Sequence, residues 1–131
     1  MHGVAVSIAR LAILVLFAQG AVAWAQGANP HNGTWKLLIQ TPRTAYVEGV
    51  VEVKDSGGNW HTVARDSRDI CAGRDAPIVV RTATPEQLEF RVMRSKVMTG
   101  CPDFQVPLKR VDDARFEGAL SNGFKVQLTR Q

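Results

Sequence analysis

Hydrophobic and polar residues alternate along most of the chain beyond residue 33. In Thr34–Gln40, for example, Trp35, Leu37 and Ile39 share one face and polar residues occupy most of the other. A period of two is typical of a β-strand with one buried face. The pattern returns, sometimes weakly, in Tyr46–Lys54, Trp60–Ala64, Pro77–Ala83, Gln87–Met93, Phe104–Arg110, Arg115–Leu120 and Phe124–Arg130. No segment of useful length repeats apolar residues at helical spacing, so about eight strands are predicted.

Short turns join most of these segments. Asp55–Asn59 is rich in glycine, Thr84–Glu86 contains a proline, and Asn122-Gly123 is a strong hairpin signal. Hairpin turns between consecutive strands predict an all-β, antiparallel, up-and-down meander. Because each strand must bury its apolar face, we favour a small closed barrel over a sandwich. Eight strands leave an interior that is filled by side chains or holds one small ligand.

The two cysteines flank one predicted hairpin. Cys71 precedes the strand Pro77–Ala83, and Cys101 follows Gln87–Met93. A redox pair or a metal site is the alternative, but the chain lacks the paired C-x-x-C or H-x-x-x-H spacing that zinc requires. We therefore predict one structural disulfide, which would close a loop of about 30 residues and contribute about 3–4 kcal/mol. No metal or cofactor is expected.

Residues 1–25 have the features of a secretory signal peptide. Arg10 precedes the apolar run Leu11–Ala18, and small residues at Ala23 and Ala25 offer cleavage after either one, preferably Ala25. An uncleaved membrane anchor is the alternative, although the run is about 8 residues and a spanning helix needs about 20. We expect a flexible leader at 26–33, a single β-barrel domain at 34–131, a periplasmic or secreted location, and no membrane span after cleavage.

The charges of the chain are mixed. The 131 residues carry a formal net charge of +4, but the lysines and arginines are interleaved with acidic residues. No basic run predicts a nucleic-acid surface, so nucleic acid is not expected as a partner. We expect a monomer.

The two ends of the barrel sequence resemble a known group. Gly33-Thr34-Trp35 opens the first predicted strand, and Arg130 lies in the last. A G-x-W in the first strand with a basic residue in the last resembles the calycins, which are the lipocalins and their shorter barrel relatives. The resemblance implies that Arg130 packs across Trp35 and closes one end of the barrel. The alternation agrees, because each residue shares the parity of the apolar face of its own strand.

Two further groups are candidates for a binding surface. Asp69, Arg74 and Asp75 surround Cys71, so a disulfide would pin a charged loop there, unless these charges serve only local pairing and solubility. Tyr46 and Trp60 are aromatic residues at predicted strand ends, where they could line a ligand site, anchor a partner, or pack in the core or at the rim.

A catalytic centre is not predicted. His61 with Asp66 and Asp69 could form a base with an orienting carboxylate, but adjacency in sequence does not establish geometry, and no G-x-S-x-G motif accompanies them. His31 lies in the polar leader and is expected to be a bystander. We therefore expect no enzymatic activity.

These observations favour an exported binding protein. The expected partner is a small apolar ligand inside the barrel or a protein on its surface. In size, disulfide and export the chain is also similar to bacterial inhibitors of secreted metalloproteases and of lysozyme. That similarity makes inhibition of an extracellular or periplasmic hydrolase the alternative. The volume of the interior should separate ligand binding from surface recognition.

The first prediction concerns export. N-terminal sequencing of the exported protein should begin at Gln26, or at Trp24 if cleavage follows Ala23, because these positions follow the small-residue sites. A mature chain that still carries Leu11–Ala18 would contradict cleavage.

Overall fold

The structure is a computed structural model and describes residues 3, 29–42, 46–63 and 70–131. The predicted signal peptide lies outside these residues except for Gly3. Eight strands follow one another: β1 Gly33–Gln40, β2 Tyr46–Lys54, β3 Gly57–Thr62, β4 Ala76–Thr84, β5 Gln87–Val92, β6 Phe104–Asp112, β7 Arg115–Ala119 and β8 Lys125–Arg130. A short 3-10 turn, η1 (Arg94–Lys96), lies between β5 and β6.

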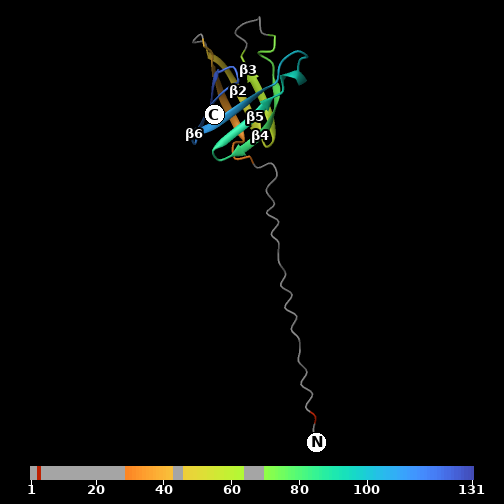
Figure 1. Cartoon of the computed structure of the whole chain (residues 1–131), viewed down its shortest axis with the longest axis vertical. Helices are drawn as coiled ribbons and strands as arrows, with labels where there is room; N and C mark the ends of the chain where they lie inside the picture. The colour runs from red at the N-terminus through yellow and green to blue at the C-terminus, as the bar shows by residue number, and fades with distance from the viewer. Residues whose placement is uncertain (1–2, 4–28, 43–45, 64–69) are drawn as a thin grey trace.

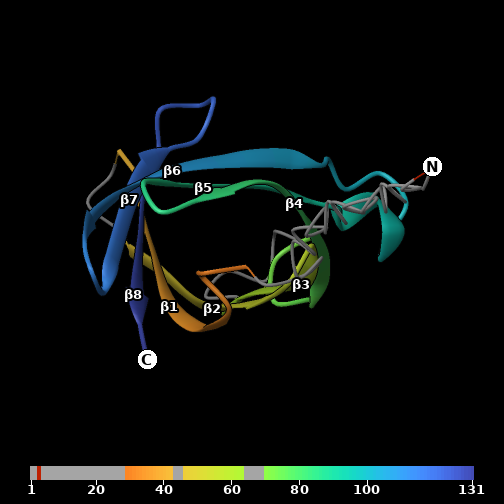
Figure 2. The same cartoon turned by 90° about the horizontal axis from the view of Figure 1, so that it is seen from below.

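The strands close into one antiparallel barrel in sequence order. Each strand pairs with the next, and β1 pairs with β8 over six residue pairs from Trp35↔Arg130 to Gln40↔Lys125. Figure 2 shows the resulting ring from below. The predicted all-β meander and its closure are therefore confirmed, and no helix among the described residues is long and apolar enough to cross a membrane.

The barrel has two different ends. β1 runs from Gly33 at one end to Gln40 at the other. The first end, at the bottom of Figure 1, carries residues 29–33 and the β4–β5 turn; we call it the closed end. The opposite end carries η1 and the β7–β8 turn, and we call it the open end.

The barrel has its shortest strand pairing between β3 and β4. Only Asn59↔Pro77 and Trp60↔Ala76 are paired there, whereas β1 and β2 share eight pairs. The strand β3 also begins earlier than predicted, because Gly57 and Gly58 belong to it and not to the turn. Gly58 has a φ of 140°, and a Cβ on it would overlap the carbonyl oxygen of Glu52. A larger residue could not adopt this close approach.

Alternating inward side chains form one continuous core. Trp35 and Phe116 pack edge to face at 5.4 Å between ring centroids, and Trp60 and Phe90 lie 6.0 Å apart. All four rings are buried. The core is completed by smaller residues, which include Leu37, Val51, Val53, Leu88, Val92, Val106, Val126 and Leu128. The middle of the barrel is therefore filled with side chains.

Arg130 covers Trp35 at the closed end. Its guanidinium carbon lies 4.4 Å from the indole centroid, and its Nη1 donates to the carbonyl oxygen of Asn32 at 3.1 Å. Arg130 remains exposed while Trp35 is fully buried, so the arginine forms a lid whose outer side is in water. This contact is the one that the calycin resemblance implied.

His31 occupies the closed end as well, so the prediction that this histidine is a bystander is wrong. The ring is buried, its Nε2 donates to the carbonyl oxygen of Thr84 at 2.5 Å, and it packs edge to face on Phe116 at 4.7 Å. The carbonyl oxygen of His31 accepts a hydrogen bond from Trp35 Nε1 at 2.9 Å. These polar contacts fix the segment, although its composition is that of a loop.

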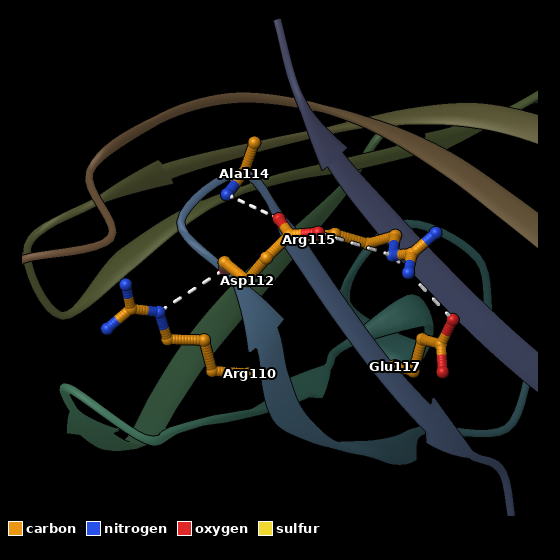
Figure 3. A network of polar contacts seen from close by, with 5 residues as sticks. All are labelled: Arg110, Asp112, Ala114, Arg115 and Glu117. Atoms are coloured by element: carbon orange, nitrogen blue, oxygen red, sulfur yellow. Dashed lines mark hydrogen bonds and ion pairs between the residues drawn. The ribbon is translucent and has the colours of Figure 1, made fainter.

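A polar network surrounds the β6–β7 turn at the same end (Figure 3). The Asp112 carboxylate accepts from Ala114 N at 2.9 Å, and its carbonyl oxygen accepts from Arg110 Nε at 3.3 Å. Arg115 Nε lies 3.9 Å from Asp112 and 3.8 Å from Glu117. Exposed ion pairs of this kind contribute little, about 0–1 kcal/mol. The network shapes the turn more than it stabilises the barrel.

The second prediction tests the closed end. Trp35→Ala should lower the free energy of unfolding by about 3–5 kcal/mol through loss of a buried aromatic. Arg130→Ala should cost about 1–2 kcal/mol through the lost cation–π contact and hydrogen bond. In urea unfolding the double variant should show coupling of about 0.5 kcal/mol or more. Arg81→Ala, on the outer face of β4, is the control and should be additive with Trp35→Ala.

A candidate binding cavity at the open end of the barrel

A cavity of about 730 Å³ opens at the end opposite Arg130. Its wall combines the last inward residue of β1, Ile39, with Val47 near the start of β2 and Phe104 at the start of β6. Leu120 and Phe124, which flank the β7–β8 turn, complete the apolar lining. These side chains are inward-facing residues at strand ends, where the filled core gives way to the mouth.

Aromatic rings form one wall of the cavity. The ring of Phe104 packs edge to face on Trp60 at 5.4 Å, and the Arg94 guanidinium carbon lies 5.1 Å from the Phe104 centroid. Trp60 is fully buried, while Phe104 is half-buried. The wall therefore changes from a buried indole inside, through a partly exposed ring, to a cation at the rim.

Two buried polar atoms that β3 contributes to this wall have no hydrogen-bond partner. They are Trp60 Nε1 and Thr62 Oγ1, which belong to cavity-lining residues on the inward face of β3. An unsatisfied buried donor or hydroxyl costs about 1–3 kcal/mol relative to a satisfied one. Native proteins contain few buried polar atoms without a partner, and a functional role is one recognised explanation for them.

Polar residues at the rim hold the η1 connection in place. The Asp103 carboxylate accepts hydrogen bonds from the backbone N and the hydroxyl of Ser95, both at 2.9 Å. The Ser95 backbone bond is the main cause that lowers the pKa of Asp103 below its ordinary value, followed by the Ser95 hydroxyl. Asp103 therefore stays ionised over the neutral range, and these bonds weaken only as pH falls through its lowered pKa.

The predicted disulfide is present at this end. Cys71 and Cys101 are bonded, with a Cα–Cα distance of 5.7 Å. Ala72 and Pro102, which follow the two cysteines, both line the cavity. The bond therefore joins the segment before β4 to the segment before β6, directly at the mouth.

The charged residues predicted to surround Cys71 do not contact one another as one group among the described residues. Asp75 accepts from His61 Nδ1 at 2.6 Å, and Arg74 Nε donates to the carbonyl oxygen of Ile70 at 3.2 Å. Asp69, like Asp66, lies outside the described residues. His61 and Asp75 are both well exposed and link β3 to β4 where the ladder between them is short. Their arrangement is that of a surface pair.

The two aromatic candidates have different positions. Tyr46 is half-exposed at the rim and lines the cavity. Trp60 is completely buried, and its indole belongs to the core and to the cavity wall, which are among the positions expected for it. Thr62, Phe104 and Phe124 line the cavity and were not singled out from the sequence. The inward parity of Phe104 and Phe124 was visible, but parity does not show where along a barrel the filled core ends.

A second hollow of about 610 Å³ lies on the outer wall, across β6, β7, β8 and β1. Its lining includes Lys109, Lys125, Glu117 and Gln127, with Leu38 between them. These are outward residues of adjacent strands and form a mixed polar surface. The open end has the more apolar and aromatic lining, so we place the candidate site there. Within the described part of the chain, no group of three or more His, Cys, Asp or Glu could hold a metal ion.

Comparisons with known proteins add little. No protein-family model matches the chain, and no curated protein matches it. Among solved structures it is similar to a redesigned β-barrel, with 20% identity, a TM-score of 0.45, and coverage of 76% of this chain and 90% of that one. The fold is therefore established by the strand pairing of the barrel itself.

The third prediction concerns the unpartnered hydroxyl. Thr62→Val keeps the shape of the side chain and removes the polar atom, so the free energy of unfolding should rise by about 1–2 kcal/mol. Thr34→Val, on the exposed face of β1, is the matched control and should change it by no more than about 0.5 kcal/mol. Urea titration of both variants measures the difference. A destabilised Thr62→Val protein would mean that the hydroxyl is hydrogen-bonded.

Proposed function

We propose that this protein binds a small, largely apolar molecule that carries a hydrogen-bond acceptor, in the cavity at its open end. The observation that supports this most directly is an apolar, partly aromatic cavity with two unpartnered polar groups in its wall. Ligand sites are typically cavities of about 300–1,000 Å³, lined by apolar side chains with a few placed polar groups. The volume of about 730 Å³ falls within this range.

The polar atoms define the chemistry of the ligand. An indole N–H can only donate, and a threonine hydroxyl can donate or accept. A carbonyl, ether or similar oxygen would satisfy Trp60 Nε1, and Thr62 could serve the same oxygen or a neighbouring group. Neither atom contacts solvent in this structure. A ligand oxygen would therefore contact Trp60 Nε1 only after side chains around the indole shift.

The ligand is expected to be uncharged where it is deepest. Five residues of the lining, Ile39, Val47, Trp60, Thr62 and Phe124, carry no ionisable group. An unpaired charge buried against these residues would be strongly disfavoured. Charged groups of the lining, Arg94 and Asp103, lie at the rim, where a polar tail of the ligand could remain in water.

The remaining parts of the proposal concern location and ancestry. We propose that residues 1–25 are a cleaved signal peptide and that the barrel acts in the periplasm or outside the cell; the disulfide is compatible with such an oxidising compartment. We further propose that the barrel follows the calycin plan. The G-x-W at Gly33–Trp35 and the 4.4 Å stacking of Arg130 on Trp35 support this relationship. No catalytic role is proposed for any residue.

The fourth prediction tests the cavity with two naphthalenes of similar size, 2-acetylnaphthalene and 2-isopropylnaphthalene. Both should bind, and the ketone should bind about 2- to 10-fold more tightly, because a net hydrogen bond contributes about 0.5–1.5 kcal/mol. In a ¹H–¹⁵N correlation spectrum the Trp60 indole N–H should shift on ketone binding. The Trp35 indole N–H should not shift, because it already donates to His31.

Two matched variants locate the binding. Val47→Trp places a large side chain in the mouth and should weaken both probes at least tenfold. Val50→Trp adds the same side chain to the outer face of β2 and should leave binding unchanged. If neither naphthalene binds the wild-type protein, or if both variants bind equally well, the cavity is not a ligand site.

A further inference from the structure

The disulfide joins two segments that both contribute to the wall of the cavity. Ala72 and Pro102 each follow a bonded cysteine directly, and both line the cavity. Cys101 is buried and Cys71 is half-buried, so one partner of the bond is shielded while solvent reaches the other. The placement of Ala72 relative to Pro102 is therefore set by a covalent bond.

The segment that carries Cys101 is also fixed by contacts of its own. The Asp103 carboxylate accepts two hydrogen bonds from Ser95. The strand β6 begins directly afterwards, at Phe104, and pairs with β5 over six residue pairs. Pro102 therefore keeps its position whether or not the disulfide is present.

Residues 70–75, which carry Cys71, are attached to the barrel more weakly. They precede β4, whose pairing with β3 is limited to two residue pairs and begins at Ala76. In this segment Asp75 accepts a hydrogen bond from His61 at 2.6 Å, but both side chains are exposed, and exposed pairs of this kind are weak. The disulfide is therefore the stronger of these two attachments.

We propose that the oxidation state of this disulfide controls ligand binding in the cavity. With the bond intact, Ala72 is held in the wall beside the fixed segment of Pro102. With the bond reduced, residues 70–75 can move outward, so the ligand loses apolar contact and must order this side of the mouth when it binds. The oxidised protein is therefore the tight-binding form. This inference rests on the proposed function, because it concerns the same cavity.

A dithiol is the class of reductant that the change requires. Its thiolate attacks the sulfur of the half-buried Cys71, forms a mixed disulfide and displaces the Cys101 thiolate, which takes up a proton. The second thiol of the reductant then attacks its own sulfur in the mixed disulfide and displaces Cys71. The reductant leaves as a cyclic disulfide, and the protein has gained two electrons and two protons.

Binding of 2-acetylnaphthalene to the oxidised and the reduced protein tests the proposal. Dithiothreitol supplies the reduced form, and thiol labelling confirms that both cysteines are free. Reduction should raise the dissociation constant at least fivefold, because one side of the mouth is no longer preorganised. In a ¹H–¹⁵N correlation spectrum reduction should shift the indole N–H of Trp60, which lines the cavity, and not that of Trp35 at the closed end.

The converse measurement is the thiol–disulfide equilibrium of the protein in dithiothreitol buffers. Linkage requires the ligand to favour the disulfide by the same factor by which reduction weakens the ligand. A concentration of 2-acetylnaphthalene that saturates both forms should therefore shift the equilibrium at least fivefold toward the disulfide. A fivefold shift corresponds to about 20 mV for this two-electron couple.

Three variants separate the mouth from general stability. Cys71→Ala/Cys101→Ala should reproduce the weak binding of the reduced protein. Val53→Ala, which removes buried side-chain volume near the closed end, is the control and should leave the dissociation constant within about twofold, since distant sites act independently. His61→Ala should weaken binding more in the reduced protein than in the oxidised one, because both attachments of residues 70–75 are then lost.

Three results would overturn the proposal. They are equal dissociation constants for the oxidised and reduced protein, a weakening by Val53→Ala as large as that by reduction, and loss of the folded Trp35 signal on reduction, which would make the bond a requirement of the fold. If the oxidised protein binds neither naphthalene, the proposed function fails as well. If both forms bind equally, only the redox control fails.

Discussion

Closure of β1 onto β8 is the constraint on which the rest of this structure depends. The six residue pairs between these strands remove both edges of the sheet and turn the alternating apolar faces of eight strands toward one axis. They also bring Arg130 beside Trp35, although 95 positions separate them in the chain. Without this pairing the apolar faces of the strands would lack a common interior, and two unpaired edges would be exposed.

The closed end shows how polar groups stabilise a barrel terminus. Trp35 buries its ring against Phe116 and still satisfies its indole N–H through the carbonyl oxygen of His31. The His31 ring is satisfied in turn by Thr84. Each buried polar atom in this chain of contacts has a partner, which is the condition under which buried polar networks rigidify a fold. The open end differs, because Trp60 presents the same indole group without a partner.

Much of this fold could be predicted from the sequence, because its strongest signals are local. Period-two alternation located all eight strands, and the cysteines flanking one hairpin located the disulfide. The parity of Trp35 and Arg130 placed both on the inner face. The segment 29–33 could not be predicted, because the hydrogen bond from His31 to Thr84 spans 53 positions and leaves no pattern in a polar stretch.

The candidate site was harder to predict for a related reason. Trp60 and Thr62 alternate with His61 and Val63, so the apolar residue Val63 on the outer face obscures which side of β3 is buried. Alternation also assigns every inward residue the same role, whether it fills the core or lines a cavity. The distinction depends on where facing strands separate, which is a property of closure and of the short β3–β4 ladder.

The two ends therefore carry different physical roles. At the closed end, aromatic packing, the cation–π contact of Arg130 with Trp35, and satisfied hydrogen bonds all contribute to folding stability. At the open end, the unsatisfied polar atoms and the short β3–β4 ladder each act against it. Selection for stability alone would favour valine at Thr62. The disulfide lies at this weaker end, where it ties the segment before β4 to the segment before β6 and limits how far these two segments can separate.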